Sequence, residues 1–327
     1  ARLHARFGQL DLIENVPEPV RWHLQAAATL ADKQQIAVRW EVGQIRAALA
    51  GLDAPLVVLK GAAYVMAGLP AARGRLFNDI DILVPRGLLN RAEAALMLAG
   101  WHPTGLSSYD ERYYRRWMHE IPPMQHSRRA TVIDVHPAIL PDTARYFPDP
   151  LKLLGRIVPV ADMPGVYVLS AEDRILHSAT HLFHDGELPH GLRDLMDLDL
   201  LLRHEAGAPR FWPRLAARAN ELQLGRSLFY ALRYAHHFLD TPVPREVWRE
   251  LRSAAPTPPL LRMMDSIFSR ALAPTHASCD DALSPLARQA AYIRAHWLRM
   301  PSHLLLPHLF HKAFISPYQD GESPKAA

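Results

Sequence analysis

The sequence predicts an α/β (α+β) domain with a small mixed sheet, followed by an all-helical C-terminal domain. Two apolar runs typical of strands, 56–59 and 79–84, flank a short helical segment, and a hairpin is expected over 117–136. After residue 170 the pattern changes to helical spacing of apolar residues, with prolines between the segments. The chain has 327 residues, 49% of them hydrophobic, which is sufficient for two separate cores.

The first half divides into a helical arm and the expected α/β domain. Residues 21–50 have apolar side chains at helical spacing, and we assign residues 1–54 to an N-terminal helical arm. The α/β domain is expected over 55–165. Its strands are expected at 56–59, 79–84, 117–126 and 130–136, with 101–109 as a strand or a loop. Its helices are expected at 62–69 and 88–98, where glycine or proline ends each segment.

The second half is expected to form the helical domain, over residues 166–314. A capping serine followed by acidic residues, Ser170 to Asp173, marks the start of its first helix. The expected helices are 171–185, 191–204, 211–239, 244–253, 258–270 and 284–298. Residues 302–314 form a final amphipathic segment, which either packs on the body or serves a partner or a membrane surface. Residues 315–327 are expected to be a disordered tail.

Composition limits the class of protein. The net charge is +4, and nearly all of the basic charge is arginine spread along the chain, which suits anionic ligands but does not require a nucleic acid. The single cysteine, Cys279, excludes an intramolecular disulfide and a cysteine zinc cluster. The sequence shows no secretory apolar region and no apolar run of about 18 residues. We therefore expect no membrane span and a cytoplasmic location.

The chemistry is expected where the first strand ends and the second begins. Asp79 and Asp81 flank Ile80, and because side chains alternate along a strand, both aspartates point to one face. Two adjacent carboxylates repel each other unless a cation lies between them, and oxygen ligands without cysteine suit Mg²⁺ or Mn²⁺ rather than zinc. Lys60 and Gly61 end the first strand, where a glycine lets backbone N–H groups approach a phosphate. The stretch therefore predicts a metal–triphosphate site.

Asp134 is the candidate for a third carboxylate. It lies between apolar residues on an expected strand, where a buried unpaired aspartate would be costly. Taken alone, such an aspartate is more often a turn or cap residue, but the upstream Asp79 and Asp81 favour a metal ligand. His136 lies two residues further on and shares the face of Asp134, so it could orient the carboxylate or contact the nucleotide.

Four motifs then occur in order: Lys60-Gly61-Ala62, Arg75, Asn78 to Val84, and Ile133 to His136. This order resembles the DNA polymerase β-type nucleotidyltransferase superfamily. Within it, the sequence is most similar to the uncharacterised bacterial nucleotidyltransferases with Leu-Lys-Gly and Asp-Ile-Asp motifs. The resemblance covers roughly residues 55–200 and implies a nucleotidyltransferase-like domain. The chain departs from the superfamily at Gly61-Ala62, where Gly-Gly or Gly-Ser is usual, so the phosphate turn lacks a serine hydroxyl.

The resemblance implies a metal-dependent transfer of a nucleoside monophosphate from a nucleoside triphosphate, ATP among them, to an acceptor hydroxyl, with release of pyrophosphate. It implies that Asp79, Asp81 and Asp134 are catalytic and hold two Mg²⁺ or Mn²⁺ ions, and that Asp134 helps to deprotonate the acceptor. Lys60 and Arg75 would assist the leaving pyrophosphate. The residues expected to contact the nucleotide in this half are Lys60, Gly61, Ala62, Arg75 and His136.

A second polar cluster lies in the helical half. Asp173, His177 and His181 are spaced four residues apart and form one stripe of a helix. Three interpretations remain open: hydrogen bonds to Arg193 and Asp197 of the next helix, contacts to the nucleotide or acceptor, and a zinc site. The bacterial nucleotidyltransferases that the chain resembles carry a similar histidine and Leu-Arg-Asp-Leu helix pair. His181 and Arg193 are therefore included among the expected nucleotide-binding residues.

Two classes of function remain open at this point. The first is the transferase, whose acceptor is a protein or peptide, a small molecule or RNA, with the first two favoured over RNA. An arginine and aromatic cluster over 109–129 is compatible with RNA binding but is more often an exposed loop edge. The second class is a non-catalytic nucleotide-sensing or partner-binding module on the same fold. A metallohydrolase that uses the histidine stripe is a third, weaker alternative.

Overall fold

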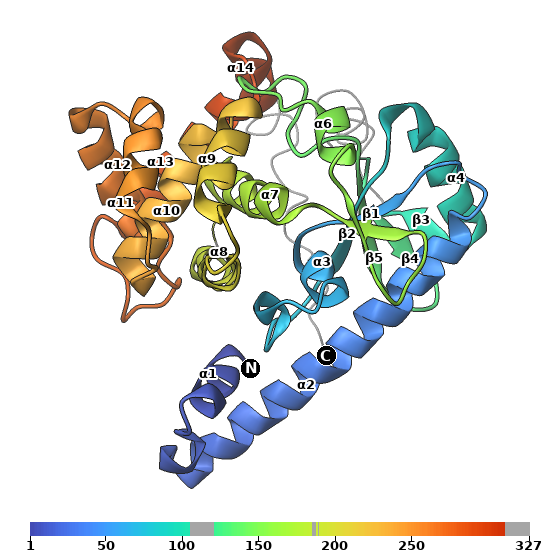
Figure 1. The fold of residues 1–327 in the computed structure, drawn as a ribbon, viewed down its shortest axis with the longest axis horizontal. Helices are drawn as coiled ribbons and strands as arrows, with labels where there is room; N and C mark the ends of the chain where they lie inside the picture. The colour runs from blue at the N-terminus through green and yellow to red at the C-terminus, as the bar shows by residue number, and fades with distance from the viewer. Residues whose placement is uncertain (105–120, 185–187, 189, 311–327) are drawn as a thin grey trace.

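A computed structural model of the chain describes residues 1–104, 121–184, 188 and 190–310, apart from the side chains of residues 308–310. Within this part of the chain a seven-stranded mixed sheet lies beside the long N-terminal helix, and the helices of the C-terminal half form a separate group (Figure 1). This arrangement confirms the predicted α/β fold with a mixed sheet and a helical C-terminal part.

The sheet is organised around the pairing of β2 with β5. Its strand order is β3-β4-β5-β2-β1-β7-β6, in which β2 is parallel to β5 and antiparallel to β1. The strands are β1 (Leu56–Val58), β2 (Asp79–Leu83), β3 (Trp101–Pro103), β4 (Met124–His126), β5 (Val132–His136), β6 (Val158–Pro159) and β7 (Val166–Val168). Val57, Ile82 and Val135 are fully buried, because helices and loops cover both faces of these central strands.

The short helix α3 (Lys60–Met66) connects β1 to β2. The helix expected over 62–69 begins two residues earlier and ends at Met66, before a 3₁₀ turn at Pro70–Ala72. Lys60, the first residue of α3, has a φ of +45°, in the left-handed region. This conformation costs a non-glycine residue roughly 1–2 kcal/mol. The backbone is therefore strained where the chain leaves β1.

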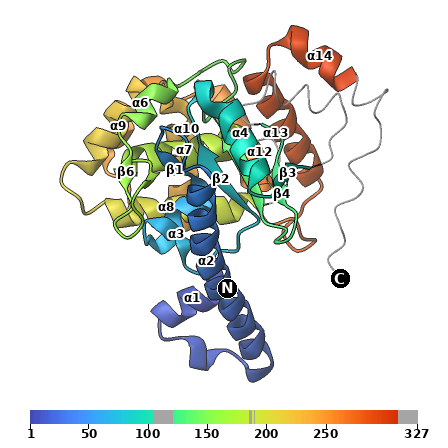
Figure 2. The ribbon, with the colours of Figure 1, turned by 90° about the vertical axis from the view of Figure 1, so that its right-hand side faces the viewer.

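The long helix α2 (Glu18–Ala48) spans 31 residues. Its C-terminal half packs Val38, Val42 and Ile45 into the core and contacts α3 and α4 (Leu89–Leu98). Its N-terminal half extends beyond the sheet in both views and is accompanied there by α1 (Arg2–Gln9) (Figures 1 and 2). The arm predicted from the sequence therefore has an inner end that belongs to the core of the sheet.

Helix α7 (Ala171–His184) is the centre of the helical half, and most of its residues are buried. It contacts α8, α9, α10 and α13. The other helices are α6 (Pro150–Leu154), α8 (Gly191–Glu205), α9 (Phe211–Glu221), α10 (Gly225–Leu239), α11 (Arg245–Glu250), α12 (Pro258–Ala271), α13 (Ser284–Arg299) and α14 (Ser302–Phe310). Among the described helices, none combines the length and the apolar character needed to cross a bilayer.

The structure differs from the sequence prediction at several boundaries. The single helix expected over 211–239 is two helices, because the chain breaks after Glu221 and Gln223 takes a φ of +60°. The strands β6 and β7 are not expected from the sequence, and β7 pairs with β1 just beyond the expected boundary at residue 165. The division into domains stays a prediction, and the expected tail at 315–327 lies outside the described residues.

A buried ion pair joins α7 to α9. Arg218 donates from Nε to Asp173 Oδ1 at 2.6 Å and from Nη2 to Asp173 Oδ2 at 2.9 Å. The side chains of Arg218 and Asp173 are only 3% and 0% exposed. The hydrogen bonds to Asp173 raise the pKa of Arg218, so the guanidinium stays charged at every accessible pH. The sequence interpretation that paired Asp173 with α8 is wrong, and this carboxylate instead holds α9 against α7.

We expect Asp173→Asn to lower the free energy of unfolding by about 3–5 kcal/mol, because the change removes the buried counterion of Arg218 and leaves only the half-exposed Glu221, at 2.8 Å. Glu246→Gln is the matched control, since Glu246 and Arg249 pair on the surface at 3.6 Å and are 68% and 67% exposed. The control should change the stability by less than about 1 kcal/mol. Urea denaturation measures both values. Equal losses in the two variants would contradict the structural role of Asp173.

Candidate active site and metal centre

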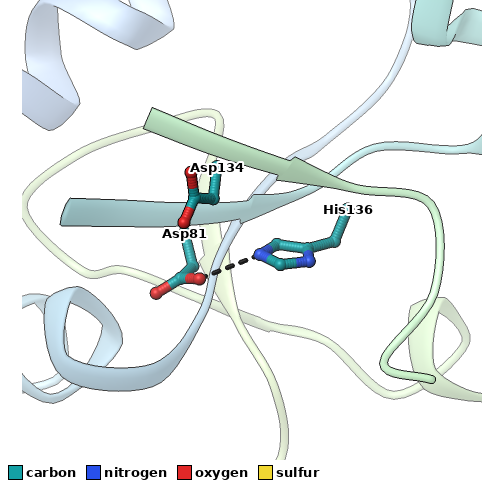
Figure 3. A group of neighbouring side chains, drawn as sticks. All are labelled: Asp81, Asp134 and His136. Atoms are coloured by element: carbon teal, nitrogen blue, oxygen red, sulfur yellow. Dashed lines mark hydrogen bonds and ion pairs between the residues drawn. The ribbon is translucent and has the colours of Figure 1, made fainter. Parts of the chain in front are cut away.

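The parallel pairing of β2 with β5 brings the expected carboxylates together. The register places Asp81 opposite Asp134 and Leu83 opposite His136. Because side chains alternate along each strand, Asp79, Asp81, Asp134 and His136 share one face of the sheet. In Figure 3 the side chains of Asp81, Asp134 and His136 gather on this face, with the imidazole directed at the carboxylate of Asp81.

Asp81 is the most strongly held of these groups. Its side chain is 3% exposed, and its Oδ1 lies 2.7 Å from Lys60 Nζ and 2.8 Å from His136 Nε2. Burial by itself raises the pKa of Asp81, but the Lys60 ammonium and the His136 ring outweigh burial and lower the pKa below its ordinary value. Asp81 is therefore a carboxylate at any pH at which the protein would work.

Asp79 differs from Asp81 in its surroundings. It lies at the exposed start of β2, at the mouth of a pocket. The carboxylate of Asp79 is partly shielded from water by neighbouring groups and is repelled by the charge of Asp81. Both effects raise the pKa of Asp79. Two carboxylates two residues apart on a strand thus have opposite pKa shifts, because protein cations contact the inner one.

Asp81, Asp134 and His136 form the candidate metal centre. One potential ligand atom from each residue lies within 4.8 Å of the others, a spacing short enough for a single ion to bind all three. Carboxylate oxygens and an imidazole nitrogen are ligands that divalent metal ions accept. The sequence prediction named Asp79, Asp81 and Asp134 as the metal ligands. The structure places His136 in the inner group and Asp79 further out, at the pocket mouth.

Gly61 is needed for packing against Arg75. A Cβ atom on Gly61 would lie 2.5 Å from Arg75 Nε, so any side chain there would displace the guanidinium. The sequence interpretation assigned this glycine to a phosphate turn, whereas its open side is filled by Arg75. Ala62 is buried, at 2% exposure, and is not part of the pocket wall. The pocket wall is therefore formed by the charged groups of Lys60 and Arg75 rather than by Ala62.

Arg75 is held from the helical half of the molecule. Its guanidinium pairs with Asp197 of α8 and lies 3.6 Å from Asp194 Oδ1. Arg2, from the start of α1, pairs with the same Asp197 and donates to the backbone oxygens of Ala71 and Arg73. These contacts attach the loop before β2 to α8. The orientation of Arg75 in the pocket therefore depends on an aspartate more than 100 residues away in the sequence.

A pocket of about 360 Å³ opens over this face of the sheet. Asp79 and Asp134 contribute carboxylates to its wall. The cationic and histidine side chains of the wall are Lys60, Arg75, Arg193, Arg299, His181, His184 and His190. The expected residues Lys60, Gly61, Arg75, His181 and Arg193 all lie in this wall. Four full positive charges and two carboxylates make the pocket suitable for a polyanion bound together with a metal ion.

Sequence analysis did not identify His190 or Arg299 as pocket residues. Arg299 ends α13, whose C-terminus is held because Thr143 donates to the Arg299 carbonyl at 2.7 Å and Arg145 donates to the Leu298 carbonyl at 3.1 Å. No local pattern connects residue 299 with a strand at residue 79. The two residues meet only because the end of α13 and the start of β2 line the same pocket, so no signal in the sequence could have revealed it.

His177 occupies a different environment from His181. It is 4% exposed, and burial together with the nearby charge of Lys60 lowers the pKa of His177 to about 3. In the part of the chain that the structure describes, the metal-compatible group does not include His177 or His181. The zinc interpretation of the histidine stripe therefore has no support from the geometry. His177 is a neutral buried side chain beneath the site.

Several residues considered from the sequence lie outside the described residues. They form the greater part of the arginine and aromatic cluster over 109–129. Arg129, which is described, pairs with Glu41 at 2.8 Å and covers the rings of Trp40 and Trp101 at 5.3 and 4.8 Å. This arginine therefore stabilises the contact between α2 and the β4–β5 turn.

Comparison with known proteins gives a family match. The family is described as an uncharacterised nucleotidyltransferase, and its model matches residues 1–240. The matched range includes the whole sheet, α7 and α8, but not α13 with Arg299. No curated protein and no solved structure matches the chain.

The buried His184 predicts an acid-sensitive stability. Burial and the charge of Arg294 lower its pKa from 6.5 to about 4, so the unfolded chain binds a proton that the folded chain excludes between these pH values. The free energy of unfolding should fall by about 3 kcal/mol from this group as the pH drops from 7 to 4. Denaturation at several pH values should show that the free energy of unfolding falls less steeply with decreasing pH in His184→Gln than in the wild type. His23→Gln, on the exposed part of α2, should keep the wild-type slope; an unchanged slope in His184→Gln would refute the assignment.

Proposed function

Since the chain belongs to the family of uncharacterised nucleotidyltransferases, we propose that it moves a nucleoside monophosphate from a nucleoside triphosphate to an acceptor hydroxyl. Family membership implies the nucleoside triphosphate substrate. The observation that carries the proposal is the register that sets Asp81 beside Asp134, with a third potential ligand within 4.8 Å, at a pocket with cationic walls. Two carboxylates side by side repel each other, and a divalent cation between them removes that repulsion, so their placement at the pocket supports a metal-dependent reaction.

In this proposal Asp81 and Asp134 hold the metal ion, with Asp79 at the pocket mouth as a further ligand. Bound Mg²⁺ or Mn²⁺ would neutralise the phosphates and the charge that develops on the departing pyrophosphate. His136 orients Asp81 through the 2.8 Å contact between Nε2 and Oδ1. An oriented carboxylate loses less entropy on binding a cation, so His136 supports the metal centre even where it does not contact the ion.

The cationic wall would hold the phosphates. Arg75 is fixed by Asp197, and Lys60 is fixed by Asp81, so both charges are in place before the nucleotide arrives. Arg193 and His181 line the same pocket from α8 and α7. Preorganised charges of this kind stabilise a developing anion without the cost of reorienting water. They take over the role that a serine hydroxyl at the position of Ala62 would otherwise share.

The transfer requires the acceptor oxygen to attack the α-phosphorus while the bond to the bridging oxygen of pyrophosphate breaks. We propose that Asp134 accepts the proton of the acceptor hydroxyl, because it lines the pocket together with Asp79 and lies opposite Asp81 in the sheet. The acceptor is a protein or peptide side chain or a small molecule in preference to RNA. The pocket would admit the hydroxyl between the sheet and the helices α7, α8 and α13 that form its other wall.

A nucleotide-sensing module is the second candidate, and one contact favours it. Lys60 and His136 already compensate the charge of Asp81, so this carboxylate is stable in the fold without a metal ion. A protein that only senses nucleotide would keep the pocket and its cations and would show no turnover. Asp134, in the same pocket, favours the transferase, because sensing does not require a proton acceptor there.

Transfer of label from [α-³²P]NTP to a fraction of a cell lysate tests the proposal. Asp81→Asn and Asp134→Asn should each reduce the labelling by at least about 100-fold, since each removes a charge that the metal and the proton transfer need. Asp142→Asn is the matched control, because Asp142 pairs with Arg86 on the surface and is 55% exposed. Labelling that is equal in all three variants would contradict the assignment. Nucleotide binding without labelling in the wild type would favour the sensing module.

Lys60→Gln separates the two proposed roles of this lysine, which are compensating the charge of Asp81 and binding the phosphates. Removing the ammonium that lies 2.7 Å from Asp81 Oδ1 makes this carboxylate a better cation ligand. We expect the affinity for Mn²⁺ without nucleotide, measured by electron paramagnetic resonance, to rise several-fold, and the affinity for the nucleotide to fall. Lys152→Gln, which changes a 45% exposed lysine, should alter neither value. Weaker Mn²⁺ binding by Lys60→Gln would show that Asp81 does not take part in the metal site.

A further inference from the structure

A second cavity adjoins the pocket at Asp79. It has a volume of about 300 Å³ and lies between α2 and the starts of β2 and β5. Phe77, Asn78 and Asp79 line both cavities, so the two spaces meet on the segment that leads into β2. A ligand held at Asp79 can therefore extend from one cavity into the other.

The second cavity has a different character from the first. Apolar side chains of α2 and β2, among them Ala37, Val38 and Ile80, form much of its wall. The charges of Glu41 and Arg129 cancel, because Arg129 Nη2 lies 2.8 Å from Glu41 Oε1 and Thr131 donates to the same oxygen at 2.8 Å. The interior away from Asp79 is thus electrically neutral. It suits an uncharged group, whereas the first cavity suits phosphates.

Two aromatic rings line this neutral space. Trp40 is 53% exposed, unusually high for so large an apolar side chain that lines a cavity. Phe77 is held in place because its N–H donates to Gln34 Oε1 at 2.9 Å and the guanidinium of Arg75 lies 5.7 Å from its ring. The guanidinium of Arg129 likewise lies 5.3 Å from the Trp40 ring. Aromatic rings together with arginine planes are the usual partners of flat heteroaromatic groups.

Building on the proposed function, we propose that the second cavity binds the nucleobase of the nucleoside triphosphate. The triphosphate then lies in the cationic cavity, and the sugar passes over Asp79, where the two cavities join. Trp40 and Phe77 are the contacts for the base, and Ala37 marks the floor of its site on α2.

The position of Asp134 favours the base over the acceptor as the occupant. Asp134 lines the first cavity but not the second, and in the proposed reaction it takes the proton of the acceptor hydroxyl. The acceptor must therefore approach through the first cavity. Of the carboxylates Asp79, Asp81 and Asp134, only Asp79 lines the second cavity. This cavity is therefore available for the part of the nucleotide on the other side of the α-phosphate.

The test compares two probes that share phosphates but differ in the base. Calorimetry with Mg²⁺ would measure the binding of tripolyphosphate and of ATP, GTP, CTP and UTP, and the best-bound nucleotide would serve for the variants. Ala37→Phe fills the cavity from an exposed position of α2, and Trp40→Ala removes one aromatic wall. Ile36→Phe is the matched control, because Ile36 is 72% exposed on the same helix and does not line the cavity.

We expect both cavity variants to weaken nucleotide binding by about 10-fold or more, as loss of base–aromatic stacking does, and to leave tripolyphosphate binding unchanged. Ile36→Phe should match the wild type for both probes. Unchanged nucleotide binding in Ala37→Phe and Trp40→Ala would overturn the inference, and so would a wild type that binds tripolyphosphate as tightly as any nucleotide. Unchanged nucleotide binding with lost labelling of the acceptor would assign the cavity to the acceptor instead. A wild type that binds neither probe would refute the proposed function itself.

Discussion

The parallel pairing of β2 with β5 is the constraint on which the rest of the site depends. In a parallel pair, residues at the same level of the register share a face, so Asp81 and Asp134 must lie side by side. Their mutual repulsion has to be offset within the fold, and Lys60 and His136 do so from the end of β1 and from β5. The strained backbone of Lys60 and the close contact of Arg75 with Gly61 both lie at the edge of this charged group.

A second layer of contacts holds the positive side of the pocket. Asp197 on α8 binds Arg75 and Arg2 together, and thereby connects the loop before β2, the start of the chain and the helical half. The helical half is itself fixed by the buried pair of Asp173 with Arg218. The geometry of the cationic side of the pocket is therefore determined by helix packing, whereas the geometry of the carboxylate side is determined by strand register. The carboxylate side is therefore easier to recognise from the sequence than the cationic side, because strand alternation is a local pattern and helix packing is not.

Local sequence patterns predicted the carboxylates of the site, but they could not predict the contacts that depend on long-range packing. Alternation along a strand needs only neighbouring residues, so the shared face of Asp79 and Asp81 follows from the sequence, as do most of the strands and helices. The place of His136 in the inner group depends on the register between two strands more than 50 residues apart. Tertiary packing places Arg75 against Gly61 and brings Arg299 into the pocket. Such packing leaves no periodic signal in the sequence. The break between α9 and α10 was missed because the left-handed residue is Gln223, a residue type that seldom takes this conformation, and Gly225 two residues later is also compatible with a continuous helix.

Arg299 gives the pocket two parts with separate constraints. The carboxylates and the sheet lie within residues 1–240, which the family shares, whereas α13 lies outside that range and contributes its terminal arginine to the same wall. Substitutions in the last described helices can therefore reshape the α13 side of the pocket without disturbing the register of β2 and β5. In such an arrangement the shape of the pocket and the placement of the carboxylates can change independently of each other.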